Sequence, residues 1–225
     1  MHAFIDESKR GGYALCAVTV ATGDLTALRK QMNALRPPGH TRIHMTGVGK
    51  KLAPKIVAEV ARLEANSRIY VMSSRKVNER QARDATLAAA VRDLAQMPVT
   101  NLVIESCDQD HEDNRIIRDE LGAGAPFRYG HDRPTNPLLW IPDVHAWAWG
   151  RGGSMRAKIA HRITVVRVCK HENAPQCTRG VRRMWVGAQG WKPLGGAAYR
   201  GTSAPETSYT NHFPRLLPRA PTLCR

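Results

Sequence analysis

Segments with strand-like and helix-like periodicity alternate along the first 168 residues of this 225-residue chain. Residues 2–8 and 11–20 are rich in β-formers and are joined by a short turn, which predicts a β-hairpin. Helical patterns at 23–35, 50–65, 77–96, 111–121 and 136–150 then alternate with strand patterns at 67–74, 99–110 and 163–168. This order predicts an α/β fold, in which a mixed sheet is flanked by helices.

The chain is strongly basic, with 34 Lys and Arg against 19 Asp and Glu and a formal charge of +15. Such an excess points to a polyanionic partner, most simply nucleic acid, either DNA or RNA. Residues 169–225 contain nine Lys or Arg, two Glu, six Pro and six Gly, and they lack a clean periodicity. We therefore expect a domain over 1–168 followed by a flexible, poorly ordered basic tail over 169–225.

Several classes of protein are excluded by the absence of their signals. No apolar run approaches the ~20 residues that span a bilayer. The N-terminus lacks the basic-then-apolar pattern of a signal peptide, so we expect a cytoplasmic protein without a membrane partner. Neither a GxxxxGK[ST] phosphate loop nor a GxSxG nucleophile elbow is present, which excludes an NTPase and an α/β-hydrolase.

Two of the predicted strands end in carboxylates. Asp6 and Glu7 close the first strand, and because strand residues alternate faces, Asp6 shares a face with the apolar Phe4. Glu105 lies near the end of a later strand, with Asp108 and Asp110 close behind as alternatives to it. If both strands are central and parallel, these acids meet at one edge of the sheet. A turn residue is the competing interpretation of Asp6.

A third acid lies in the apolar segment 138–151. Asp143 follows Pro142 there, and it is either a helix N-cap or a further member of the acidic group. Carboxylates that share a site raise one another's pKa, and hard divalent cations relieve the repulsion. Mg²⁺ and Mn²⁺ prefer such oxygen ligands, and a pair of these ions supports in-line displacement at phosphorus. The residues thus favour metal-dependent cleavage of a phosphodiester bond.

Four motifs in this order resemble the domain of unknown function 3800 family. They are "FIDES" at 4–8, "RIHMT" at 42–46, "NLVIES" at 101–106 and "LLWIPDVHAWAWGR" at 138–151. The resemblance covers residues 2–168 and implies an RNase H-like fold. It also implies that Asp6, Glu105 and Asp143 are catalytic metal ligands, with His44 and Glu7 beside the site.

The remaining candidate residues have two interpretations each. His44 is either a proton shuttle or a structural residue. Trp140, Trp147 and Trp149 either stack bases, as in single-strand binders, or pack in the core. We expect His145 to be a packing or a surface residue.

We therefore expect a metal-dependent nuclease or phosphodiesterase that binds Mg²⁺ or Mn²⁺. The alternative is a catalytically inactive nucleic-acid-binding module on the same fold. A binder would hold nucleic acid equally well in chelator, with a steep dependence on salt.

Overall fold

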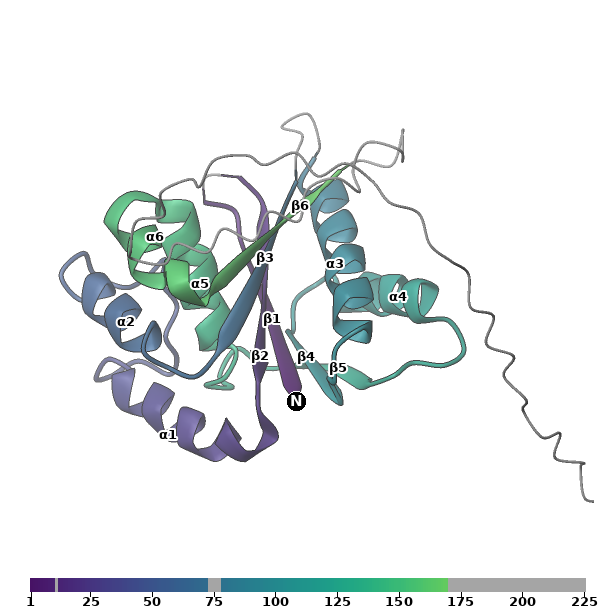
Figure 1. Ribbon diagram of the computed structural model, residues 1–225. Coiled ribbons are helices and arrows are strands. Elements are labelled where there is room, and N and C mark those ends of the chain that lie inside the picture. Colours follow the sequence, from purple (N-terminus) through teal and green to yellow (C-terminus); the bar gives the residue numbers. More distant parts are fainter. Residues whose placement is uncertain (11, 73–77, 170–225) are drawn as a thin grey trace, which may run out of the picture. The chain divides into compact units, whose positions relative to one another are not determined.

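A six-stranded mixed sheet forms the centre of the computed structural model, which describes residues 1–10, 12–72 and 78–169 (Figure 1). The strands are β1 (His2–Ser8), β2 (Ala14–Val20), β3 (Asn66–Met72), β4 (Asn101–Glu105), β5 (Arg128–Asp132) and β6 (Ile163–Val168). Their order across the sheet is β5-β4-β1-β2-β3-β6. β2 runs antiparallel to both of its neighbours, whereas the β1–β4, β4–β5 and β3–β6 pairs are parallel. The first strand is therefore an interior strand.

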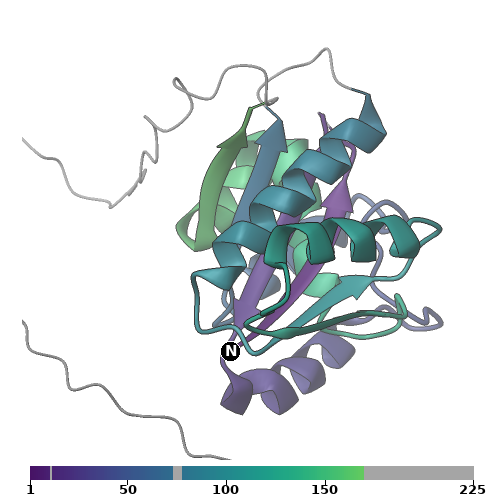
Figure 2. The same ribbon diagram turned by 90° about the vertical axis from the view of Figure 1, so that its right-hand side faces the viewer.

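Helices cover both faces of this sheet (Figures 1 and 2). One face carries α1 (Leu25–Leu35), α2 (Ala53–Val60), α5 (Trp140–Arg151) and α6 (Gly153–Ile159), and the other carries α3 (Glu79–Ala95) and α4 (Asp110–Leu121). Each face has its own apolar core, and the alternation of strand side chains divides β1 between them. Phe4 is buried under the first group of helices and Ile5 under the second. The arrangement confirms the predicted fold class of an α/β protein with a mixed sheet flanked by helices.

Most of the predicted elements are present, and some bounds differ. The helix predicted over 50–65 is shorter, because α2 spans only Ala53–Val60. The structure adds β5 and α6, which the periodicity did not predict. Two 3-10 turns, Thr22–Asp24 and Ala160–Arg162, precede α1 and β6.

The chain divides into two units, Met1–Gly187 and Ala188–Arg225, and all described residues belong to the first. The basic tail predicted over 169–225 lies outside the described residues, apart from Cys169. In the part of the chain that the structure describes, no helix is both long and apolar enough to cross a membrane.

Gly150 marks a close approach between α5 and the chain that follows β1. A Cβ atom added at Gly150 would lie 2.1 Å from the carbonyl oxygen of Arg10, which is backbone and cannot move aside cheaply. We expect Gly150→Ala to lower the free energy of unfolding by about 1–3 kcal/mol, as overpacking does. Urea unfolding measures this effect, with Gly124→Ala as the control, since a Cβ there meets nothing within 4 Å. Equal unfolding midpoints for the two variants would contradict the close approach.

Candidate functional site

Asp6 and Glu105 lie side by side at one edge of the sheet. In the parallel ladder between β1 and β4, Ile5 pairs with Ile104, and each acid is the next residue along its strand. Both isoleucines belong to the core under α3 and α4. Because side chains alternate, Asp6 and Glu105 face the opposite side, toward α5. This meeting of two strand-end acids is the arrangement that the sequence predicted.

Asp143 reaches the same region from above the sheet. It lies in the first turn of α5, which packs against β1 and β2, and its side chain is largely buried with 7% of the residue exposed. The N-cap position belongs to Leu139, so the N-cap interpretation of Asp143 is wrong. Pro142 also stays within the first turn, where a missing N–H is tolerated. The Oδ2 atom of Asp143 instead accepts a hydrogen bond at 2.9 Å from the backbone N–H of Met45.

The segment Arg42–Met45 links the acids to one another. Nη1 of Arg42 lies 3.3 Å from Oε1 of Glu105, within hydrogen-bonding distance. Two residues later, Nδ1 of His44 lies 3.6 Å from Oδ2 of Asp143, and half of the His44 side chain is exposed. The predicted His44 therefore lies beside the predicted acids. Arg42 was not predicted as a site residue, and only its position two residues before His44 hinted at it.

The electrostatics of the group reflect the crowding of like charges. Burial raises the pKa of Asp6 well above its usual range, and the charges of Asp143, Glu105 and Glu7 raise it further. Burial also raises the pKa of Glu105, against the opposing effect of Arg42. The hydrogen bond to Asp143 raises the pKa of His44. Three carboxylates held this close to one another are unfavourable unless a cation compensates them.

The donor set fits a hard divalent cation. Asp6, Glu105 and Asp143 offer only carboxylate oxygens, which are the ligands that Mg²⁺ and Mn²⁺ prefer. The oxygens of these three acids do not all lie within 4.8 Å of one another. In the described part of the chain, the group that meets this spacing is Cys107, Asp110 and Asp113. Arg42 therefore stands as the local counter-charge for Glu105.

That other group consists of Cys107, Asp110 and Asp113, on the α4 side of the sheet. Its acids already have partners. Arg83 donates to both carboxylate oxygens of Asp113, at 3.0 and 2.7 Å, and His131 lies 3.4 Å from the same side chain. Asp110 accepts hydrogen bonds from the hydroxyl of Ser106 and the backbone N–H of Cys107. A cation would have to displace these donors, so this group is an ion-paired network rather than an open ligand set.

Glu7 pairs with Arg83, the same arginine that binds Asp113. Its Oε2 atom lies 2.6 Å from Nη1 of Arg83, on the face of the sheet opposite to Asp6. The sequence predicted Glu7 as a residue beside the acidic site. The structure places its side chain in the Arg83 network instead, because adjacent strand residues point to opposite faces.

The other candidates divide between the core and the surface. Trp140 is buried and its indole N–H donates to the carbonyl of Pro134, so it packs in the core. Trp147 and Trp149 are partly buried, and the guanidinium groups of Arg10 and Arg156 lie over their rings. His145 is fully buried and contacts the hydroxyl of Ser67 at 2.6 Å. Burial lowers the pKa of His145 to about 3, so of the two predicted positions, core and surface, this histidine occupies the core and is neutral.

Comparison with known proteins gives no family. No family model and no curated protein matches the chain. A solved structure that matches is that of the PCNA:RNase HII complex from Archaeoglobus fulgidus. The likeness has a TM-score of 0.46 with 16% identity, and it covers 65% of this chain and 70% of the other chain. The resemblance to the domain of unknown function 3800 family therefore stays a prediction.

Proposed function

We propose that the protein is a metal-dependent nuclease or phosphodiesterase that hydrolyses phosphodiester bonds of DNA or RNA. The observation that carries the proposal is the convergence of Asp6, Glu105 and Asp143 from two strands and a helix onto one edge of the sheet. The formal charge of +15 supports a polyanionic substrate. The resemblance of the sequence motifs to the domain of unknown function 3800 family is consistent with this function.

In the proposed site, Asp6, Glu105 and Asp143 hold Mg²⁺ or Mn²⁺. When bound, these ions lower the pKa of a coordinated water and stabilise the charge on the leaving oxygen. Met45 and His44 orient the Asp143 carboxylate through its Oδ2 atom.

His44 has a further proposed role, as the residue that gives a proton to the leaving oxygen after the P–O bond breaks. Its Nδ1 faces Asp143 and half of the side chain is exposed, so the other ring nitrogen is free to act.

A second function is favoured by one observation. Arg42 already neutralises Glu105 without any metal, which is what a nucleic-acid-binding module that lacks catalysis would require. Such a module would use the basic surface for phosphate contacts and would have no need of a divalent ion. Metal dependence separates the two functions.

The test measures cleavage of plasmid DNA and of a structured RNA by the full chain. We expect cleavage in Mg²⁺ or Mn²⁺ and none in chelator, together with saturable binding of the same ions by calorimetry. The physical reason is that the three carboxylates repel one another until a cation joins them. Nucleic-acid binding that is equal in metal and in chelator, without cleavage in either, would contradict the nuclease and favour the binding module.

A further inference from the structure

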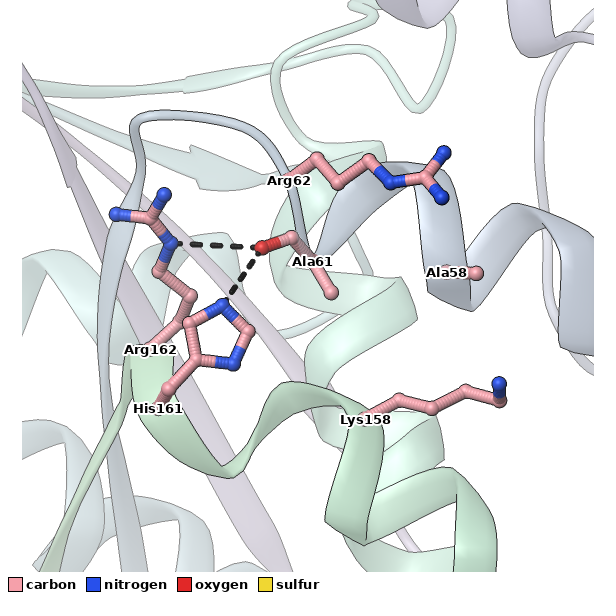
Figure 3. A pocket seen from close by; sticks show the side chains of 6 residues that line it. All are labelled: Ala58, Ala61, Arg62, Lys158, His161 and Arg162. Carbon is pink, nitrogen blue, oxygen red and sulfur yellow. Dashed lines mark hydrogen bonds between the residues drawn. The ribbon is translucent and has the colours of Figure 1, made fainter. Parts of the chain in front are cut away.

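A basic pocket lies between the end of α2 and the segment α6 to β6. Its volume is about 480 Å³, and it is lined by Ala58, Ala61, Arg62, Lys158, His161 and Arg162 (Figure 3). Arg62, just after α2, and Lys158, from α6, extend in the same direction in this view. Four of the six lining residues thus carry nitrogen-bearing side chains, and the other two are alanines.

The pocket is separate from the acidic site. β3 begins at Asn66, which pairs with Thr19, and this is the edge of the sheet where β1 begins at His2. Asp6 lies four residues after His2 along β1, so the two residues are about 13 Å apart at the usual rise of a strand. Because Ala61 precedes β3, the pocket lies beyond the opposite edge of the sheet, on the face that α2 and α6 cover.

One carbonyl group organises the inner wall of this pocket. The oxygen of Ala61 accepts hydrogen bonds from Nε2 of His161 at 3.0 Å and from Nε of Arg162 at 3.4 Å (Figure 3). Both side chains are thereby anchored to the end of α2. Because a carbonyl oxygen can only accept, Nε2 of His161 carries the proton in this hydrogen bond, and Nδ1 does not contact Ala61.

The charge of the pocket is positive after its ion pairs are counted. Arg62 pairs with Glu59 and Arg162 pairs with Glu64, but neither glutamate lines the pocket. The side chains of Glu59 and Glu64 are 47% and 77% exposed, and such exposed pairs are weak and exchange readily. Among the described residues, Lys158 has no carboxylate partner, so its charge is available to a ligand.

We propose that this pocket binds a phosphate group of a nucleic-acid backbone, as a contact distinct from the cleavage site. Arginine and lysine are the side chains that suit phosphate oxygens. No Phe, Tyr or Trp is among the lining residues, and the one ring present, that of His161, is bonded through Nε2 to the carbonyl of Ala61, so the pocket is suited to a phosphate rather than to a stacked base. A contact of this kind positions the nucleic acid without reading its sequence. The identity of the polymer rests on the proposed function, whereas the phosphate chemistry rests on the pocket alone.

The test compares Lys158→Gln with Lys30→Gln in the full chain. Lys30 is an exposed lysine of α1 outside the pocket, so the two variants lose the same charge. Binding of a labelled single-stranded oligonucleotide is followed by fluorescence anisotropy in chelator, over a series of salt concentrations. We expect Lys158→Gln to weaken binding about fivefold to tenfold at 0.1 M salt and to reduce the salt slope by about 0.7, the value for one phosphate contact. Lys30→Gln should leave the slope unchanged.

Each outcome decides the proposal separately from the nuclease. Oligonucleotide binding is measured in chelator, where no divalent ion is available to the acidic site. Binding therefore tests the pocket, whereas cleavage in Mg²⁺ or Mn²⁺ tests the acidic site. Identical salt slopes for Lys158→Gln and Lys30→Gln would overturn the pocket and leave the nuclease standing. Wild-type protein that binds no oligonucleotide would overturn the pocket proposal together with the nucleic-acid partner. A Lys158 effect in a protein that never cleaves would support the pocket and refute the nuclease.

The free anion is the other source of the same chemistry. Inorganic phosphate is therefore titrated by calorimetry into the wild type and Lys158→Gln. Phosphate binding that depends on Lys158, combined with oligonucleotide binding that does not, would assign the pocket to small phosphate compounds and overturn the backbone contact. Competition between inorganic phosphate and the oligonucleotide in the wild type, but not in Lys158→Gln, would support it.

Discussion

Asp6→Asn is expected to reduce cleavage by at least about 100-fold without destabilising the protein. Substitution of a residue that merely supports a metal ligand costs 10–100-fold, so loss of a direct ligand should cost no less. In chelator the free energy of unfolding should stay equal or rise. Burial raises the pKa of Asp6, and the nearby charges of Asp143 and Glu105 raise it further, so the ionised carboxylate is unfavourable in the folded chain. Asparagine removes that charge.

The amide also keeps a local contact. Oδ1 of Asp6 accepts the backbone N–H of Glu7 at 2.7 Å, and the oxygen of an asparagine side chain can accept the same bond. The measurements are initial cleavage rates in Mg²⁺ and urea unfolding in chelator, on the same samples.

Asp108→Asn is the matched control for this substitution, because Asp108 is exposed and follows β4 just beyond Glu105. We expect Asp108→Asn to cleave like the wild type. A normal rate for Asp6→Asn would refute the proposed ligand set. A loss of cleavage in Asp108→Asn, with Glu105→Gln active, would move the third ligand from Glu105 to Asp108.

Arg83→Met is expected to be the most destabilising of these substitutions, lowering the free energy of unfolding by about 3–5 kcal/mol. Arg83 and Asp113 are 3% and 1% exposed, and the guanidinium contacts Asp113 through two nitrogens and Glu7 through the third. Methionine fills much of the same volume but leaves the Asp113 carboxylate buried with only His131 beside it. An uncompensated buried charge is the source of the cost.

Arg92→Met controls for loss of an arginine from the same helix. Arg92 also contacts both oxygens of a carboxylate, that of Glu120, but 48% of its side chain is exposed. Its replacement should cost no more than about 1 kcal/mol, as for surface ion pairs. If Arg83→Met and Arg92→Met lower the free energy of unfolding equally, burial does not determine how much the Arg83 network stabilises the fold. The double variant Arg83→Met, Asp113→Leu should be more stable than Arg83→Met alone, because it leaves no unpaired Asp113 carboxylate in the core.

The same network predicts a pH dependence. Burial raises the pKa of Asp113, but hydrogen bonds from His131 and Arg83 outweigh it, and the net shift is downward from 3.8. A carboxyl group with a lowered pKa in the folded state stabilises the fold above its unfolded pKa, and this stability is lost as the pH falls through the folded value. Wild-type stability should therefore fall in acid below about pH 4, and the fall should be smaller in Arg83→Met, which can be followed by thermal unfolding.

Local patterns in the sequence determined most of the sheet and two of the acids. β6 occupies the predicted residues 163–168, and α1 (Leu25–Leu35) lies within the helix predicted over 23–35. The period of the apolar residues predicted these elements, because it indicates which side of a strand or helix is buried. The positions of Asp6 and Glu105 at strand ends predicted their meeting on the condition that the two strands are central and parallel, and the pairing of β1 with β4 meets this condition.

The same patterns did not predict two elements, β5 and α6. β5 is a polar, partly exposed edge strand, and it exists because its backbone pairs with β4 rather than because its side chains are apolar. α6 begins directly after Gly152, whose φ of +70° turns the chain between two helices. The helix predicted over 136–150 ends within one residue of the end of α5 at Arg151, but the sequence carried no signal that a new helix starts there.

The surroundings of the candidate site were decided by tertiary structure alone. Only the packing of α5 across β1 brings Asp143 to the strand ends, and only the fold of the loop before α2 brings Arg42 to Glu105 and Met45 to Asp143. These contacts join residues 63 and 98 positions apart in the chain. A periodic pattern records how one segment is buried, whereas a pairing of this kind depends on which distant surfaces meet, and that information is distributed over the whole core.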